Sequence, residues 1–317
     1  RNQVSFMLSA CNFYMPIFEE ALDAYGLPLE LRYLPIIESA LNPSAVSRAG
    51  ASGLWQFMIG TGKIYGLESN SLVDERRDPI KATWAAARYL KEMYDIYGDW
   101  NLVIAAYNCG PGTINKAIRR ANGETDYWKI YNYLPKETRG YVPAFIAANY
   151  VMTYYCDHNI CPMETNIPAS TDTVQVNKNL HFEQIADLCN VPLDQIKSLN
   201  PQYKKQMIPG DSKPYTLRLP IDAISTFIDK QDTIYAHRAD ELFRNRKTVA
   251  VKEITPSTRK TTTAVAGKGK LTYYTIKSGD TLSTIAGKYG VTIKDIQRWN
   301  GMSNTKIAAG KRLKIYK

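Results

Sequence analysis

The 317-residue sequence predicts an α+β multidomain fold, in which a mainly α domain is followed by two small βααβ modules. Up to about residue 165, apolar residues recur at helical spacing and almost nothing alternates with a period of two. Past that point, short β-like stretches flank pairs of short helical patterns, and this arrangement occurs twice. The length allows two or three domains of roughly 100–200 residues each, so such a division is expected.

The first domain is predicted to consist of amphipathic helices with recognisable ends. Asp78 precedes Pro79, which is typical of an N-cap followed by proline in the first turn of a helix. That helix is predicted to end at Gly98, since glycine often follows the last helical residue. Similar patterns predict further helices at 15–26, 101–108 and 140–155.

The second half of the chain contains an internal repeat. Sliding one copy along the other gives a register of 100 residues, in which Asn200 aligns with Asn300. After a four-residue insertion in the first copy, residues 217–219 align with residues 313–315. Shared positions in a constant order are hard to obtain by chance, so we interpret the copies as two βααβ modules.

The whole chain is predicted to have five parts. Between the modules, one or two helices fit residues 221–243, and a basic stretch rich in Ser and Thr follows. The five parts are the α domain at 1–165, a first, degenerate module at 172–220, a helical connector at 221–245, a basic linker at 246–270 and a second module at 271–317.

The formal net charge of +10 is concentrated in one stretch of the chain. Residues 244–270 contain eight Lys or Arg and one acid, so this stretch alone contributes +7. It is poor in aromatic residues, which is typical of a solvated linker rather than of a binding surface. Because no nucleic-acid-binding motif accompanies the charge, we expect no nucleic-acid partner.

The composition also argues against metal centres and membrane spans. Five cysteines and three histidines occur, none at the spacing of a zinc site, so we expect no metal and no organic cofactor. No apolar stretch reaches the ~18 residues of a membrane-spanning helix. In an oxidising compartment, Cys156 and Cys161 could close a small disulfide loop, and the odd total leaves at least one thiol free or paired outside this chain.

One carboxylate, Glu38, lies within an apolar run. Leu34, Ile36 and Ile37 precede it, and Leu41 follows. An acid in such a run is either neutralised by a structural partner, or burial raises its pKa so that it can act as a catalytic acid. The sequence of this segment leaves both interpretations open.

Three further segments contain residues suited to a sugar-binding site. The stretch GASGLWQFM contains two glycines, which permit close approach of a ligand, and Gln56, which can donate to and accept from sugar groups. Tyr107 and Asn108 precede another Gly/Pro turn, and Tyr141 lies on a separate segment. Trp55 either lines the groove or packs in the core.

Together and in this order, these motifs resemble the lysozyme-like lytic transglycosylases, which cut bacterial peptidoglycan. The resemblance covers about residues 15–155, and each of its four blocks is short. The blocks are Glu38-Ser39, GLWQ at 53–56, AYN at 106–108 and YVP at 141–143.

The repeated modules resemble the lysin motif (LysM), a carbohydrate-binding domain. The second copy contains its signature, SGDTLSTIA, at residues 278–286. In the first copy, Asn179 and Leu180 replace Gly279 and Asp280. This departure leaves open whether the first copy binds sugar or is a structural remnant.

The resemblance implies a lysozyme-like catalytic domain with one catalytic acid, Glu38. Glu38 would protonate the β-1,4 bond between MurNAc and GlcNAc, and its carboxylate would then accept the proton of the MurNAc 6-hydroxyl as that oxygen closes on C1. The product would be a 1,6-anhydro sugar, and no water would be consumed. The implied substrate-binding residues are Ser39, Gln56, Tyr107, Asn108 and Tyr141, and an Asx turn would explain Asn108 equally well.

For the second module, the resemblance implies glycan contacts at Gly279, Asp280, Thr281, Leu282 and Asn300. The implied partners are peptidoglycan glycan strands, and the implied location is the bacterial cell envelope, in the periplasm. A lipid anchor to the outer membrane, upstream of Arg1, is a further expectation of the same resemblance. The oligomeric state and the choice between exolytic and endolytic cleavage stay open.

Two other functions are compatible with the sequence. Asp74, Glu75 and Asp78 could supply the second carboxylate of a hydrolysing muramidase, although two arginines among them favour an ion-paired loop. A non-catalytic peptidoglycan-binding protein would keep Glu38 for structural reasons only. The environment of these carboxylates in the fold separates the alternatives.

Overall fold

A computed structural model of the chain describes residues 2–164, 167–168, 170–243, 271–277, 280–302 and 307–316, without the side chain of Ser283. The chain divides into two compact units, Arg1–Ile254 and Thr255–Lys317. Two hydrophobic cores lie in the first unit and one lies in the second. The basic linker predicted at 246–270 lies outside the described residues, and the five predicted boundaries stay predictions.

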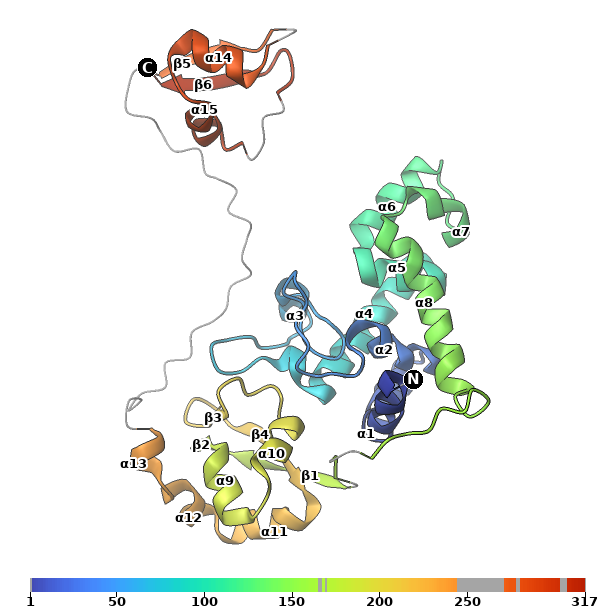
Figure 1. The fold of residues 1–317 in the computed structure, drawn as a ribbon, viewed down its shortest axis with the longest axis vertical. Coiled ribbons are helices and arrows are strands. Elements are labelled where there is room, and N and C mark those ends of the chain that lie inside the picture. Colours follow the sequence, from blue (N-terminus) through green and yellow to red (C-terminus); the bar gives the residue numbers. More distant parts are fainter. Residues whose placement is uncertain are drawn as a thin grey trace. The chain divides into compact units, whose positions relative to one another are not determined.

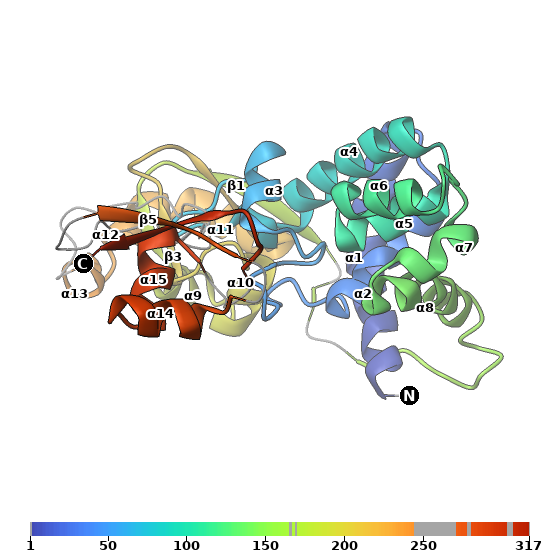
Figure 2. The ribbon, with the colours of Figure 1, turned by 90° about the horizontal axis from the view of Figure 1, so that it is seen from above.

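The first unit begins with a mainly α domain, as predicted. Its helices are α1 (Asn2–Ala24), α2 (Leu34–Ser39), α3 (Ile59–Ile64), α4 (Pro79–Tyr97), α5 (Trp100–Cys109), α6 (Pro111–Arg120), α7 (Tyr127–Ile130) and α8 (Lys136–Thr153), with short 3-10 helices η1 (Leu29–Tyr33), η2 (Glu75–Arg77) and η3 (Tyr131–Tyr133). Contacts run from α1 to α4, from α4 to α5 and from α5 to α8 (Figures 1 and 2). One hydrophobic core fills the space between these helices.

Helix α4 has the ends that the sequence predicts. Asp78 accepts hydrogen bonds from two backbone N–H groups of the first turn, and Gly98 follows the last residue with a φ of 63°. Helices α5 and α8 correspond to the patterns at 101–108 and 140–155, while the pattern at 15–26 belongs to the longer α1. The predicted helical character of this domain is therefore confirmed.

Trp55 packs in the core of the α domain. Its side chain is fully buried, and its ring N–H donates a hydrogen bond of 2.9 Å to Thr83 Oγ1. The indole also lies edge-on to Phe18, with ring centroids 5.3 Å apart. Of the two interpretations of Trp55, the structure favours core packing.

Both repeats fold as βααβ modules, which confirms the register of 100 residues. The first module contains β1 (Thr171–Val176), α9 (Phe182–Cys189), α10 (Leu193–Leu199) and β4 (Tyr215–Pro220). The second contains β5 (Leu271–Thr275), α14 (Leu282–Tyr289), α15 (Ile293–Asn300) and β6 (Arg312–Tyr316). In each module the first and last strands pair antiparallel.

An asparagine has the same structural role in both modules. The side-chain amide of Asn200 donates to the carbonyl of Arg218 and accepts from its N–H, both at 2.8 Å. Asn300 makes the same two bonds with Lys314, at 2.7 and 2.6 Å. Each asparagine therefore ties the end of the second helix to the last strand.

The first module also contains a second pair of short strands that the sequence did not predict. Strand β2 (Asn179–His181) pairs antiparallel with β3 (Met207–Pro209). Gly210 follows β3 in sequence and packs against the backbone of Lys178. An added Cβ at Gly210 would lie 2.2 Å from the carbonyl oxygen of Lys178. Strand β2 lies in the segment that aligns with the LysM signature of the second module.

The connector after the first module contains three helices, so the prediction of one or two helices is wrong. They are α11 (Ile221–Asp229), α12 (Gln231–Ala236) and α13 (Ala239–Leu242). The break before α13 has a structural cause, because Arg238 has a φ of 50° and its guanidinium pairs with Asp187 and Glu241. The ion pair with Asp187 of α9 holds the end of the connector against the first module.

The described residues also show whether the chain has membrane-spanning helices or a disulfide at 156–161. No described helix is both long and apolar enough to cross a bilayer. All five cysteines are free thiols, and Cys156 and Cys161 are exposed, so the small disulfide loop is not formed in this structure.

Gly53→Ala is expected to destabilise the first unit, because Gly53 lies against the backbone of Arg76. Its φ is 89°, and an added Cβ would lie 1.7 Å from the carbonyl oxygen of Arg76. We expect the free energy of unfolding to fall by about 3 kcal/mol or more, from the strained backbone and the clash together. Urea denaturation followed by tryptophan fluorescence measures the change.

Gly140→Ala provides the matched control. Gly140 lies within α8, and an added Cβ would meet nothing within 4 Å. Alanine at this position is expected to stabilise the helix by about 0.5–1 kcal/mol. Equal effects of the two substitutions would contradict the proposed close contact at Gly53.

Candidate active site

Glu38 lies in the last turn of α2, immediately before a sharp reversal of the chain. Ala40 and Leu41 both have left-handed backbones, with φ values of 51° and 59°. This conformation costs a non-glycine residue roughly 1–2 kcal/mol. The N–H groups of the two residues donate to the carbonyls of Ile36 and Pro35, and the side chain of Leu41 is buried in the core. These contacts hold the reversal that positions Glu38 beside α8.

The carboxyl group of Glu38 is half-buried, and its pKa is raised. Burial raises the pKa of Glu38 to about 7, a hydrogen bond from Tyr141 lowers it, and the charge of Glu137 raises it. Tyr141 Oη donates this short hydrogen bond to Oε1 of Glu38. A carboxyl whose pKa lies near neutrality can both give and take a proton. The structure therefore favours the interpretation of Glu38 as an acid with a raised pKa.

Two predicted site residues hold the loop at 50–57 through its backbone. Ser39 Oγ donates to the carbonyl of Leu54 at 2.9 Å, and Tyr107 Oη donates to the carbonyl of Trp55 at 2.7 Å. Burial raises the pKa of Tyr107 well above its usual value, and the nearby charge of Glu38 raises it further. Ser39 and Tyr107 thus join the loop to the surroundings of Glu38.

Gln56 belongs to the same loop and has an unusual backbone, with a φ of 47°. Its amide nitrogen donates to the carbonyl of Gly53 at 2.8 Å and to that of Ala45 at 3.3 Å. The loop itself therefore holds the nitrogen of this amide. The carbonyl oxygen of the side chain is the end that Gln56 can offer to a ligand.

Asn108 contacts the helix that carries Tyr141. Its Oδ1 accepts a hydrogen bond of 2.8 Å from Thr138 Oγ1, and Thr138 is buried in the first turn of α8. Thr138 lies three residues before Tyr141, so this bond joins α5 to the part of α8 that faces Glu38. No local sequence pattern marks Thr138, a buried threonine, as a contact of the site.

The three acids at 74–78 are engaged within their own segment. Asp74 accepts two hydrogen bonds of 2.8 Å from Arg76, which together with Lys204 holds the pKa of Asp74 below its usual value against the effect of burial. Glu75 is buried and pairs with Lys81. Asp78 caps α4. This arrangement is the ion-paired loop that the two arginines favoured.

Arg76 is a residue of the site region whose role no local sequence pattern predicts. Its guanidinium is buried, and Nη1 donates to the carbonyls of Gly50 and Phe57, both at 2.9 Å. Arg76 therefore clamps the two ends of the 50–57 loop. The alternation of acids and arginines indicated ion pairs, but nothing local indicated the contact with a loop about 20 residues earlier.

In the second module, two of the predicted glycan contacts lie at the start of α14. Asp280 Oδ2 accepts hydrogen bonds of 2.8 Å from Tyr274 Oη and from the N–H of Lys277. Thr281 caps α14 in a reciprocal arrangement with the third helical residue. Both side chains are therefore shaped by local contacts, and their role in glycan binding stays a prediction.

The other predicted contacts of this module are placed differently. Leu282 is 2% exposed and packs in the core of the module. The amide of Asn300 ties α15 to β6, and Gly279 lies outside the described residues. The side chain of Leu282 is thus not presented to a ligand.

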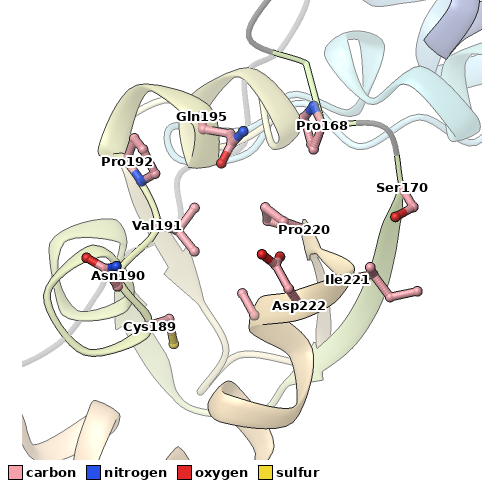
Figure 3. Close-up of a pocket in the computed structure, with 11 residues that line it drawn as sticks. Pro168, Ser170, Cys189, Asn190, Val191, Pro192, Gln195, Pro220, Ile221 and Asp222 are labelled. Carbon is pink, nitrogen blue, oxygen red and sulfur yellow. The ribbon is translucent and has the colours of Figure 1, made fainter.

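A pocket of about 560 Å³ opens elsewhere, on the first module (Figure 3). It lies between the turn that joins α9 to α10 and the start of α11, where Asn190, Pro192, Pro220 and Asp222 line it. None of the predicted site residues lines this pocket. Among the residues that the structure describes, no group of three or more His, Cys, Asp or Glu side chains could hold a metal ion.

Three family models match successive parts of the chain. Residues 15–130 match the Transglycosylase SLT domain. Residues 170–236 match the LysM-like domain of lytic transglycosylase MltD, and residues 274–315 match the LysM domain. The chain thus carries an SLT-type transglycosylase domain followed by two LysM-type domains, which confirms the predicted fold class.

Among individual proteins, the chain is 33% identical over 296 residues to membrane-bound lytic murein transglycosylase D of Escherichia coli, a match covering 92% of this chain and 60% of that protein. It is also 33% identical over 124 residues to the soluble lytic murein transglycosylase of Escherichia coli, covering 37% and 19% of the two chains. The crystal structure of the 70 kDa soluble lytic transglycosylase of Escherichia coli matches 45% of this chain and 24% of that chain, with 29% identity and a TM-score of 0.39. The chain spans less than two thirds of the length of these relatives.

The raised pKa of Glu38 predicts that Glu38→Gln stabilises the protein in a pH-dependent way. An acid whose pKa is about 7 when folded and 4.5 in its unperturbed state favours folding at low pH, and this contribution is lost as the pH rises through about 7. We expect the variant to exceed the wild type in free energy of unfolding by about 1–3 kcal/mol at pH 8 and by little at pH 4. Urea denaturation at pH 4, 6 and 8 measures this difference.

The control is Glu20→Gln, which neutralises an exposed carboxylate on α1. It is expected to change stability equally little at the three pH values. A difference between wild type and Glu38→Gln that does not vary with pH would show that Glu38 is not held with a raised pKa.

Proposed function

We propose that this chain is a peptidoglycan lytic transglycosylase, which cleaves the β-1,4 bond between MurNAc and GlcNAc without water and leaves 1,6-anhydro-MurNAc ends. The observation that carries the proposal is one half-buried carboxyl, Glu38, with a pKa raised to about 7 and a hydrogen bond from Tyr141. The match to the SLT domain at 15–130 surrounds Glu38. The relatives named as lytic murein transglycosylases support the same substrate class.

A muramidase-type hydrolase has less support, since it needs a second free carboxylate. Such enzymes place two carboxyl groups roughly 5–9.5 Å apart to activate water or to form a covalent intermediate. Asp74 is bound to Arg76, Glu75 is bound to Lys81, and Asp78 caps a helix. The three acids that the sequence suggested for this second group are therefore already engaged.

In the proposed reaction, Glu38 acts twice. Protonated Glu38 gives its proton to the bridging oxygen as the bond between that oxygen and MurNAc C1 breaks. The carboxylate then accepts the proton of the MurNAc 6-hydroxyl as O6 bonds to C1. Glu38 regains its proton, and water is neither consumed nor released. The attacking oxygen belongs to the same sugar, and such intramolecular geometry can replace a second carboxylate.

The neighbours of Glu38 support both halves of this cycle. The hydrogen bond from Tyr141 stabilises the charged carboxylate, while burial stabilises the neutral acid that begins the cycle. Ser39 and Tyr107 would fix the 50–57 loop, and Gln56 would present its side-chain oxygen to the sugar. Asn108 would act on the substrate indirectly, by positioning Thr138 and α8, and not by direct contact.

The proposed partners are peptidoglycan glycan strands, and the proposed location is the bacterial envelope. A periplasmic location with an outer-membrane anchor is the finer proposal, supported by the membrane-bound relative. The second module would tether the enzyme to its insoluble substrate, since linked binding units raise the effective local concentration. Asp280 and Thr281, at the start of α14, are the described residues that we propose as glycan contacts, with Gly279 beside them in sequence.

Mass spectrometry of digested peptidoglycan tests the proposed reaction. The wild type is expected to release muropeptides that end in anhydro-MurNAc. Glu38→Gln is expected to lower their release by about 100-fold or more, because general acid–base catalysis typically contributes that much. Glu20→Gln should match the wild type. Reducing-end products one water heavier would show hydrolysis instead, and intact sacculi with the wild type would favour a binding protein.

Retention on sacculi tests the tether. A chain that ends at residue 243 lacks the basic linker and the second module. In the Glu38→Gln background, where the substrate stays intact, we expect this shorter chain to be retained several-fold less than the full chain. On soluble glycan fragments the two lengths with native Glu38 should form the same products. Equal retention would contradict a tethering role for the second module.

A further inference from the structure

A loop of the SLT-type domain shares a hydrophobic core with the first module. We call residues 68–77 the docking loop. The side chains of Leu72 and Val73 are buried in the core of the first module, together with residues such as Leu217. Val73 also forms an antiparallel bridge with Tyr203. The first module is therefore packed onto the α domain by apolar contacts and not merely joined to it in sequence.

Lys204 of the first module adds polar contacts to this interface. Its backbone N–H donates to the carbonyl of Leu72, and its ammonium donates to the carbonyl of Asn70, both at 2.8 Å. The ammonium also lies 3.6 Å from Asp74 Oδ2. The N–H of Asp74 in turn donates to the carbonyl of Gln202 at 2.9 Å. The module thus fixes both the backbone and the carboxylate of Asp74.

Asp74, which the first module holds in place, in turn holds the side chain of Arg76. The side chains of Asp74 and Arg76 are 2% and 6% exposed, and two parallel hydrogen bonds join them. A bidentate pair between a guanidinium and a carboxylate fixes the orientation of both side chains in addition to pairing their charges. The remaining guanidinium nitrogen of Arg76 holds the carbonyls of Gly50 and Phe57. Arg76 therefore contacts the module side and the active-site side at once.

The 50–57 loop completes the connection to Glu38. Its Leu54 carbonyl accepts from Ser39, which follows Glu38 in sequence, and its Trp55 carbonyl accepts from Tyr107. A continuous series of hydrogen bonds and packed backbone runs from Lys204 to the immediate neighbours of Glu38.

The first module differs from the second in the segment that aligns with the LysM signature. Asn179 and Leu180 stand where the second module has Gly279 and Asp280, and they form β2. Leu180 is fully buried, and Asn179 donates to Asp211. The segment is used for contacts within the chain.

We propose that the first module is a positioning element of the active site, in which Lys204 and Arg76 hold the 50–57 loop against the helix that carries Glu38. This inference rests on the proposed transglycosylase function. It assigns the first module to bracing the catalytic domain and leaves glycan tethering to the second module. Lys204 and Arg76 are positioning residues, since they act on the substrate through the loop.

Lys204→Met in the full chain tests the proposal. On soluble glycan fragments we expect kcat to fall about five- to tenfold and KM to stay within about twofold, the range expected of coupling through a packed network. Lys204→Arg retains the charge and the reach toward Asp74, and it should restore most of the rate. Lys205→Met is the matched control, because it removes the same charge from the adjacent, exposed residue.

Titration of the Glu38 carboxyl carbon by NMR provides a measurement that needs no turnover. If the loop loosens, water reaches Glu38, and its pKa should fall by about 0.5 or more from a value of about 7. Loss of a distant positive charge alone would move the pKa slightly upward, as Lys205→Met should show. This measurement shows whether Lys204 is coupled to the surroundings of Glu38, even if the wild type forms no anhydro product.

A purely structural role would overturn the proposal. It would appear as a lower melting temperature of Lys204→Met with unchanged kcat and an unchanged pKa of Glu38. If Lys204→Met does not fold, Tyr215→Phe replaces it, because it removes one hydroxyl that donates to Glu68 of the docking loop at 3.1 Å. A smaller change of kcat and pKa in the same directions supports the proposal, and no change in either refutes it.

Discussion

The hydrogen bond from Tyr141 to Glu38 joins α8 to α2, and the proposed site is arranged around it. Burial favours the neutral acid and the hydrogen bond favours the carboxylate, with burial the larger effect, so the pKa rises to about 7. A carboxyl that gives a proton and then takes one back needs this balance. With a much lower pKa it would already be ionised, and with a much higher pKa it would be slow to ionise. The packing of two helices therefore sets the chemistry that Glu38 can perform.

Several independent contacts maintain this packing. The left-handed backbones of Ala40 and Leu41 end α2 one residue after Glu38, and the burial of Leu41 offsets their conformational cost. On the opposite side, Asn108 fixes the first turn of α8 through Thr138. The position of the Glu38 carboxyl thus depends on the backbone reversal after α2 and on the bond between Asn108 and Thr138, as well as on the residues that touch the carboxyl.

Much of this fold could be predicted from local signals. Asp78 and Gly98 mark the ends of α4 because capping depends on a few adjacent residues, and the repeated modules follow from their aligned apolar positions. Glu38 was recognisable because an acid within an apolar run must either be paired or have a raised pKa. Ala40 and Leu41 were not, since neither residue favours a positive φ, and the surrounding fold imposes it. The role of Arg76 depends on tertiary contacts that no local pattern encodes.

The two modules share one frame and differ in one segment. Asn200 and Asn300 make the same bonds between the second helix and the last strand, so the frame of both modules is the same. The modules differ in the segment before the first helix, where Leu180 is buried and Asp280 is partly exposed near a capped helix start. In a reaction whose nucleophile belongs to the substrate, the protein supplies one proton carrier and accurate positioning. In the proposed arrangement the first module improves positioning through Leu72 and Val73, which lie in its core, and through Lys204, which binds the carbonyl of Asn70. The proposed use of one module as a brace and of the other as a tether fits the proposed single-acid mechanism on an insoluble polymer.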